Sequence, residues 1–224
     1  HEQRAPFVRY IAPQDLPLAH LPEYTSAVTN LPILEKAAAG NGFFNTNLDR
    51  DNVIRRIPLL MRHREQVYFS LAAETLRIVH GESTYQVKVR KPSVFARGGI
   101  EAIRISDALP WIPTDETGHL WMHYRKTNWE QIVSAGDVLD HISKSNLQGK
   151  IVFLGTSAPG LKDLRSTPLE ALAPGVDLHL QVLEQVFTGR FLVRPAWATP
   201  LEIACIFVLG GLLIYAIPRL GPLR

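Results

Sequence analysis

The sequence predicts an α/β domain, with a mixed β-sheet and flanking helices, followed by a C-terminal transmembrane helix. Three observations support this prediction. Strand-like and helix-like segments alternate along residues 33–187, which is typical of a sheet covered by helices. Two strand-like segments, 85–90 and 100–105, are joined by a stretch that ends in glycines, as in a hairpin, so the sheet is expected to be mixed. Residues 203–217 carry no charge, which indicates a membrane span.

The composition is that of a globular protein. Of the 224 residues, 46% are apolar and 20% are charged, which excludes a disordered tail, a collagen-like repeat and a coiled coil. The single cysteine, Cys205, has no partner for an intramolecular disulfide. A net charge of +3 without a basic run argues against nucleic-acid binding. The chain begins at His1 without a secretory leader, so we expect it to be part of a longer protein.

Local signals define the elements of the first half. Pro32 and Gly40 flank one apolar segment as helix start and stop, and a second helix begins at Ser70 and ends before Gly81. Residues 85–90 alternate apolar and polar side chains, as in a strand with one face in water, and Gly98–Gly99 would turn the chain back. The expected elements are helices over residues 33–39 and 70–79 and strands over 42–45, 53–61, 85–90 and 100–105.

The second half is expected to contain two strands and two helices before the span. Residues 120–124 follow a turn-rich stretch and are predicted to be a strand, and Ser134 with Asp137 fits a capping box before a short helix. The uninterrupted apolar run 151–154 suits a strand that is covered on both faces. A helix is predicted over 176–187, because apolar residues recur in it every four positions and Gly189 ends it.

The last element is predicted to cross a membrane over residues 196–218, with 219–224 as the start of the following loop. From Trp197 to Ile217 a helix would be roughly 31 Å long, which matches a hydrocarbon core about 30 Å thick. Glu202 argues for the alternative, a buried helix of a soluble protein, because a carboxylate in a span is costly. Arginines are slightly more frequent after the span than before it, which favours a cytoplasmic C-terminus.

The stretch after the 151–154 run could hold a nucleophile. Ser157 follows a strand-like segment, and Asp163 and His179 come later in the order of an α/β hydrolase. Pro159 stands where the nucleophile elbow requires its last glycine, however, and it would obstruct the tight helix entry. A membrane-anchored serine hydrolase using Ser157 and His179 therefore stays an alternative hypothesis.

The same stretch could instead bind a small molecule through its backbone N–H groups and nearby side chains. No phosphate-binding glycine motif is present, and a turn with a capping serine is the favoured interpretation. The candidate ligand-binding residues are Thr156, Ser157, Lys162, Asp163 and Arg165.

Neither of the two candidate metal-binding patterns is convincing, and we expect no catalytic residue, cofactor or metal. The acidic turn at Asp49–Asp51 lacks the six to eight oxygens that calcium needs. His119 and His123, if on one strand, would stand some 13 Å apart, too far to share zinc. Arg55 or Arg56 is expected to pair with a carboxylate of the acidic turn.

Several stretches, in order, resemble one family, the CHASE domain of the second type, over about residues 20–195. The 149–163 block (Gly-Lys-Ile-Val-Phe-Leu-Gly-Thr-Ser-Ala-Pro-Gly-Leu-Lys-Asp) is the most specific of them. Asn52 stands where this family often has a glycine. The other matching stretches are 42–45 with Asp49 and Asp51, 53–59, 70–77, 113–115 with Gly118, 124–125, 135–139, 174–176 with His179, and 194–195.

The resemblance implies an extracytoplasmic bacterial sensor, whose binding residues cannot be transferred position by position. Residues 1–195 would be an N-terminally incomplete periplasmic sensor, and the last helix would be the first span after it in the inner membrane. Such proteins carry a cytoplasmic adenylate or guanylate cyclase, histidine kinase or Ser/Thr kinase, so any catalysis would lie outside these residues. The expected partners are the lipid bilayer, an unknown small-molecule or envelope ligand, and a second copy in a homodimer.

The preferred hypothesis is therefore a membrane-tethered sensor that performs no reaction itself. The link after the 176–187 helix would pass movement of the sensor to the span, which assigns signal coupling to Phe191, Leu192, Arg194 and Pro195. Besides the hydrolase, an envelope scaffold without a small ligand stays open as an alternative.

Overall fold

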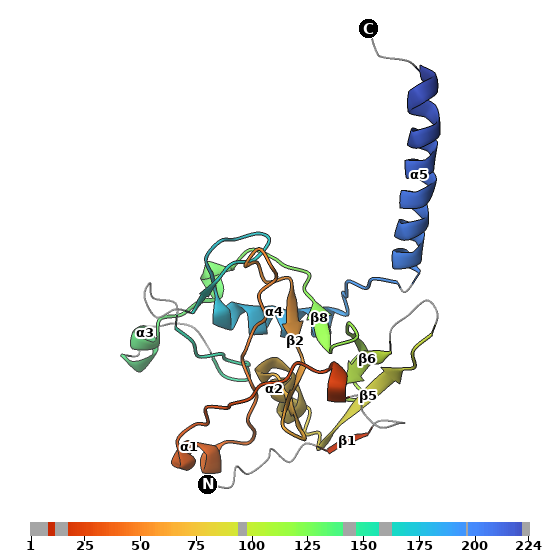
Figure 1. The fold of residues 1–224 in the computed structure, drawn as a ribbon. Helices are drawn as coiled ribbons and strands as arrows, with labels where there is room; N and C mark the ends of the chain where they lie inside the picture. Colours follow the sequence, from red (N-terminus) through yellow and green to blue (C-terminus); the bar gives the residue numbers. More distant parts are fainter. Residues whose placement is uncertain are drawn as a thin grey trace.

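The computed structural model describes residues 9–11, 18–93, 98–140, 147–156, 163–195 and 197–220. These residues form a lobe of strands and helices from which one long helix extends (Figure 1). The long helix is α5 (Ala198–Leu220), and its residues 198–217 are long and apolar enough to cross a membrane. None of that stretch is buried against the rest of the chain.

The largest sheet contains four strands in the order β1-β5-β6-β7. Strand β1 is parallel to β5, whereas β5–β6 and β6–β7 are antiparallel, so the predicted mixed sheet is confirmed. The predicted hairpin of 85–90 with 100–105 is confirmed as β5–β6, in which Val87 faces Ile103. The bounds are β1 Arg9–Ile11, β5 Thr84–Arg90, β6 Gly99–Arg104 and β7 Ile112–Pro113.

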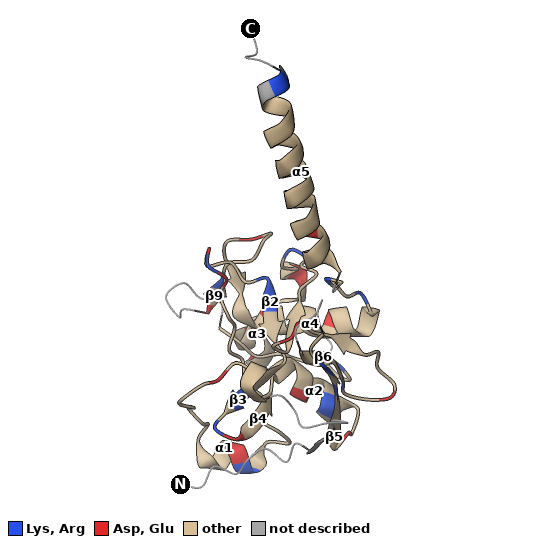
Figure 2. Ribbon diagram, turned by 45° about the vertical axis from the view of Figure 1, so that its right-hand side comes forward, with Lys and Arg blue, Asp and Glu red and all other residues tan. Residues whose placement is uncertain are grey.

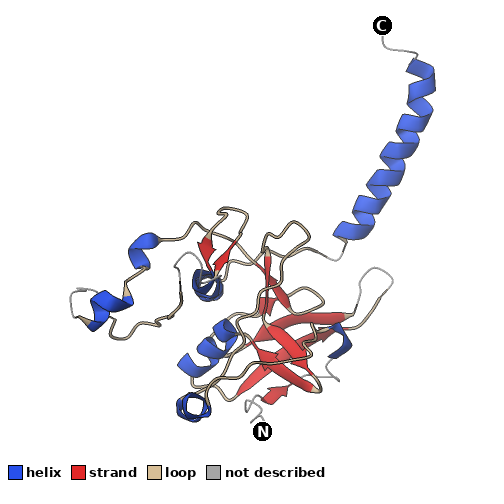
Figure 3. Ribbon diagram, turned by 60° about the vertical axis from the view of Figure 1, so that its left-hand side comes forward, coloured by secondary structure: helices blue, strands red, loops and turns tan. Residues whose placement is uncertain are grey.

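Three antiparallel pairs complete the described strands: β2–β8, β3–β4 and β9–β10. Strands and helices occupy largely separate regions of the lobe, with the β9–β10 pair above the end of one helix (Figure 3). The bounds are β2 Arg56–Pro58, β3 Leu60–His63, β4 Gln66–Phe69, β8 His119–Trp121, β9 Leu164–Arg165 and β10 Ala173–Pro174.

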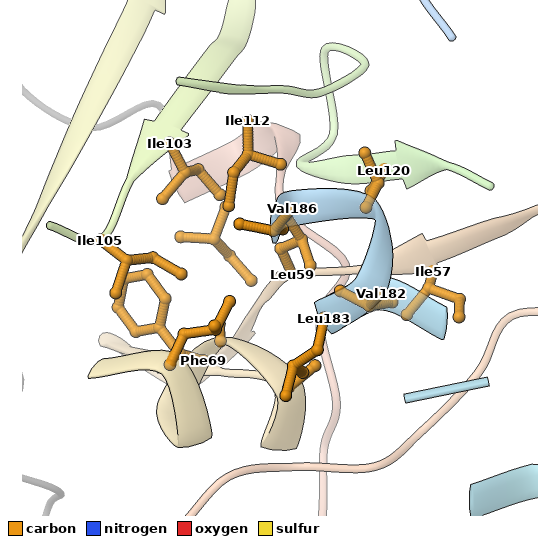
Figure 4. Packing of buried hydrophobic residues seen from close by; sticks show 14 of the residues in the cluster. Ile57, Leu59, Phe69, Ile103, Ile105, Ile112, Leu120, Val182, Leu183 and Val186 are labelled. Atoms are coloured by element: carbon orange, nitrogen blue, oxygen red, sulfur yellow. The ribbon is translucent and has the colours of Figure 1, made fainter. Parts of the chain in front are cut away.

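Two helices, α2 and α4, pack against each other and supply the helical side of the core. Val182, Leu183 and Val186 of α4 lie among apolar side chains from the strands, including Ile57 and Leu120 (Figure 4). The helix bounds are α1 Pro32–Ala37, α2 Leu71–Val79, α3 Ala135–Leu139 and α4 Gly175–Thr188, with 3₁₀ turns η1 Leu18–His20 and η2 Trp129–Gln131.

The predicted start and stop signals are confirmed at α2 and α4, whereas α1 ends at Ala37, before the expected stop at Gly40. The Ser70 hydroxyl accepts a hydrogen bond from the Ala73 N–H at the start of α2, and Gly189 ends α4 with a positive φ of 65°. Ser134 is the N-cap of α3, but its side chain makes no capping hydrogen bond. The predicted capping box is therefore wrong, although the helix itself is present.

The single strand predicted over 53–61 is wrong, because the chain changes partner within it. Strand β2 pairs with β8, whereas β3 pairs with β4. Leu59 lies between them, and its N–H donates to Gly118 while its carbonyl accepts from Ser70. Strand β4 was not predicted at all. Its turn with β3 uses Arg64 at φ 56° instead of a glycine or asparagine, so the usual hairpin signal is missing.

The strand predicted over 151–154 is also wrong. Residues 151–154 are not in a strand, and Val152 and Leu154 are exposed while Ile151 and Phe153 pack partly against the core. Only one face of this extended segment is covered, so its continuous apolar run does not report burial on both sides. Similarly, the strand predicted at 42–45 is reduced to a single bridge between Phe43 and Ser70.

Candidate functional site

A cleft of about 1150 Å³ lies between the large sheet and the segment that joins α4 to α5. One wall comes from β5, β6, β7 and Trp121 of β8. The other wall is the link 189–195 together with Thr199, Pro200 and Ile203 at the start of α5. All four predicted signal-coupling residues, Phe191, Leu192, Arg194 and Pro195, line this cleft. Its walls therefore belong both to the sensor lobe and to the candidate membrane helix.

Trp111 and Trp121 provide aromatic surface on the sheet side of the cleft. The Arg56 guanidinium lies 5.1 Å from the centre of the Trp121 ring, and that of Arg104 lies 5.0 Å from the Trp111 ring. Such cation–π contacts hold both partners in place. The aromatic part of the cleft is thus ordered by charged groups that are themselves fixed by carboxylates.

The carboxylates around the cleft share several basic side chains. Glu101 is 3.0 Å from Lys88 Nζ and 3.9 Å from Arg90 Nε. Arg56 bonds Asp49 and Asp115, each within 3.1 Å, so the predicted pairing of Arg56 with the acidic turn is confirmed. Arg55 pairs with Asp49 as well.

The carboxyl group of Asp115 is held in its charged form. Burial on its own would raise the pKa of Asp115, but hydrogen bonds from the side chain and backbone of His119 and from Thr117 outweigh this effect. The pKa is therefore well below its ordinary range, and Asp115 stays negatively charged beside Arg56. This cluster is a fixed structural group on the floor of the cleft.

Helix α4, which precedes the link, is anchored by two glutamine side chains. Their amides hydrogen-bond to backbone groups at and after the end of β8, as the backbone of a neighbouring strand would. Gln185 of α4 accepts from the His123 N–H and donates to the Trp121 carbonyl. Gln181 accepts from the Arg125 N–H, and both glutamines are almost fully buried. Arg125 adds two hydrogen bonds of 2.7 and 2.8 Å to Glu184. The position of α4 is therefore tied to the segment that continues β8.

After α4, the 189–195 link is connected to α5 by a hydrogen bond of its own. Phe191 packs against the core, whereas Leu192 and Arg194 are exposed. Arg194 donates a 2.5 Å hydrogen bond to Glu202 in α5. Figure 2 shows one acidic position near the base of α5 and a basic position at its far end, and the sequence of the helix identifies them as Glu202 and Arg219. Glu202 thus has a cationic partner at the end of the helix that faces the lobe.

Three of the five predicted ligand-binding residues, Thr156, Asp163 and Arg165, are described, and none of them lines this cleft. Ser157 and Lys162 lie outside the described residues. Thr156 is exposed, and Asp163 lies 3.8 Å from Arg165. The Asp163 carbonyl accepts from the Gly175 N–H at the start of α4. The role of these residues as a ligand site therefore stays a prediction.

His179, the base of the hydrolase hypothesis, is buried inside α4. Burial lowers its pKa, and a backbone hydrogen bond at Phe44 and the charge of Asp163 only partly oppose this effect. Its Nδ1 atom has no hydrogen-bond partner among the described residues. His179 is thus a neutral core residue in the folded chain.

Because the folded pKa of His179 is depressed, the chain should lose stability as the pH falls below the unfolded value of about 6.5. The expected result is a urea midpoint that declines between pH 7.5 and 5.5, and a smaller decline in His179→Leu. His20→Leu, at an exposed position, is the matched control and should keep the decline of the unmodified chain. If the urea midpoint declined equally with pH in all three proteins, the lowered pKa of His179 would not be the cause of the decline.

Comparison with known families identifies the domain. A family model described as the CHASE2 domain matches residues 3–215, almost the whole chain. No curated protein and no solved structure matches. CHASE2 domains are extracytoplasmic sensor domains of signalling proteins and are not catalytic, which agrees with the cleft between the sensor sheet and a candidate membrane helix. The predicted family resemblance is thus confirmed, and the chain belongs to the CHASE2 family of sensor domains.

Proposed function

We propose that this chain is the sensor region of a bacterial inner-membrane signalling protein, with residues 1–195 in the periplasm. Its output would be a cytoplasmic adenylate or guanylate cyclase, a histidine kinase or a Ser/Thr kinase, and the sensor would work as a homodimer. The family and the candidate span at 198–217 support this proposal. The chain itself receives the signal and carries out no reaction.

The observation that carries the proposal is the composition of the cleft walls. Trp111 on the sheet side, Leu192 of the link and Pro200 of α5 line the same cleft, so an occupant that fills it would contact both walls. A sensor of this kind would exist in two arrangements in equilibrium, and a ligand shifts that equilibrium only if it binds one arrangement more tightly than the other. Here the two arrangements would differ in the distance between the sheet and the start of α5. Occupancy of the cleft would then be felt directly by the membrane helix.

We expect the signal to pass through the segment between α4, which is bonded to the lobe, and α5. Helix α4 is tied to the lobe through its buried glutamines, so it moves with the lobe. Residues 190–195 contain neither helix nor strand, and the Arg194–Glu202 hydrogen bond connects them to α5. The link is therefore the segment in which movement between lobe and span must be accommodated.

The test fills the cleft covalently and asks whether the link transmits the change. In the parent protein, Cys205→Ser with Ser93→Cys places one thiol at the cleft, and a bulky maleimide is added from outside. Cyclic-nucleotide synthesis or phosphorylation in membranes is expected to change roughly 5- to 150-fold, the range of ordinary allosteric coupling. Replacing residues 191–195 by a Gly-Ser sequence should abolish this response.

The matched control replaces five exposed residues, 26–30, by the same Gly-Ser sequence, and the response should persist. Thermal unfolding must show that both variants retain the folded lobe. A full response with the Gly-Ser link would overturn the proposed path, and no response to the label in the unmodified link would overturn the role of the cleft.

A further inference from the structure

The turn between β9 and β10 presents an apolar tip to solvent. It comprises residues 166–172, of which Pro168, Leu169, Ala171 and Leu172 are exposed. The exposed fractions of Leu169 and Leu172 are 48% and 66%. Single exposed leucines are common on protein surfaces, whereas several in one turn mark an interaction site.

The one charge in this turn faces away from the tip. The Glu170 carboxylate accepts hydrogen bonds from the Thr127 N–H at 2.7 Å and from its hydroxyl at 2.8 Å. The backbone of the turn is closed as well, since the Thr167 N–H donates to the Glu170 carbonyl and the Glu170 N–H donates to the Thr167 hydroxyl. The polar side chains of Thr167 and Glu170 are therefore already hydrogen-bonded when the apolar tip meets a less polar medium.

The turn lies at the same level as the start of α5. In Figure 1, where the colour bar identifies residues 166–172, the chain between β9 and β10 reaches about the height of the first turn of that helix. If α5 crosses the bilayer, the membrane surface passes near its start, and the tip reaches the headgroup region. Trp129, which is 59% exposed, follows two residues after the Thr127 that holds Glu170. Tryptophan favours this interfacial region.

We infer that the β9–β10 turn, with Trp129 beside it, is a second membrane contact that inserts into the interface of the outer leaflet. The inference rests on α5 as the membrane span, which the proposed function also assumes. Apolar side chains gain free energy at the boundary between headgroups and acyl chains. The lobe then rests on the bilayer at two points, which sets the orientation of the cleft relative to the membrane.

A bilayer accounts for this surface better than a second protein chain does. Four exposed residues at a convex turn offer much less area than the roughly 800 Å² per partner of a stable protein interface. A lipid surface needs no complementary shape, and it is already adjacent through α5. The turn also has no charge at its tip to oppose insertion.

The test places a fluorophore on the tip. The chain carrying Cys205→Ser and Leu169→Cys is labelled with an environment-sensitive dye and reconstituted into vesicles of phosphatidylcholine and phosphatidylglycerol. Lipids with a nitroxide near the headgroup are expected to quench this label about twofold or more, with a blue-shifted emission, as insertion into the interface requires. Leu172→Cys must give the same result.

Leu34→Cys provides the matched control, because Leu34 is similarly exposed, at 56%, on α1 at the end of the lobe away from α5. Its label should be little quenched. Equal quenching at positions 34 and 169 in a vesicle-bound chain would overturn this inference and leave the proposed coupling path intact. A blue shift without quenching, with energy transfer between labelled chains, would overturn it in favour of a second copy. A chain that does not associate with vesicles would overturn both proposals.

Discussion

Glu74→Ala is expected to lower the free energy of unfolding by about 3–5 kcal/mol, the cost of breaking a buried ion pair. Glu74 is almost fully buried in α2. Its carboxylate accepts two hydrogen bonds from Arg77, at 2.9 and 2.6 Å, and one from the Tyr85 hydroxyl at 2.6 Å. Alanine would leave a guanidinium and a buried phenol without their acceptor. Urea unfolding of the chain in detergent, followed by circular dichroism, measures the loss.

One further variant isolates the tyrosine part of this network. Tyr85→Phe removes one hydrogen bond while keeping the ring stacked on Phe69 at 3.5 Å, so a loss of about 1–2 kcal/mol is expected. Burial and the neighbouring Glu74 charge raise the pKa of Tyr85, so its hydroxyl stays a donor at any working pH. Glu65→Ala, at an exposed turn, is the matched control. A loss below about 1 kcal/mol for Glu74→Ala would refute the importance of the network.

Gln185→Leu is expected to destabilise the chain by about 1–3 kcal/mol, because two partly buried backbone groups each lose a hydrogen bond. The His123 N–H and the Trp121 carbonyl are both bonded to this amide, at 3.0 and 2.9 Å. Leucine has a similar size but can replace neither bond. The same urea titration measures the effect, and hydrogen exchange of the His123 amide should become faster.

Gln185→Glu tests the direction of the two bonds. A carboxylate keeps the acceptor for the His123 N–H, but it buries a charge and sets an oxygen against the Trp121 carbonyl, so its loss of stability should be at least as large as that of Gln185→Leu. Gln131→Leu, an exposed glutamine, controls for the change in side-chain polarity. If Gln185→Leu were as stable as the unmodified chain, the glutamines would not anchor α4.

Elements with a strong local pattern were predictable from the sequence. The β5–β6 pair, α2 and α4 depend on residues that are close in the chain: alternating side chains, the Ser70 cap, and Gly189 at the end of α4. The signal for the candidate span is equally local, since it consists of one apolar run long enough to cross a bilayer. The pairing of Arg55 with Asp49 and Asp51 also involves residues that are close together in the chain.

Features that depend on distant partners could not be predicted in this way. Gly40 was expected to stop the first helix, but α1 ends at Ala37. A Cβ atom at position 40 would lie only 2.0 Å from the Glu74 carboxylate, so this glycine leaves room for the buried network. The two glutamines of α4 carry no signal in the sequence either, because their partners are backbone groups about sixty residues away.

The sequence by itself determined the class of fold, the terminal helix and, through the 149–163 block, the family. Only the tertiary structure decided that residues 151–154 are covered on one face, that Arg56 reaches Asp115, and that the link and the start of α5 form one wall of a cleft. The physical reason is that periodicity and capping act over a few residues. Burial and the pairing of charges depend instead on which distant segments the fold brings side by side.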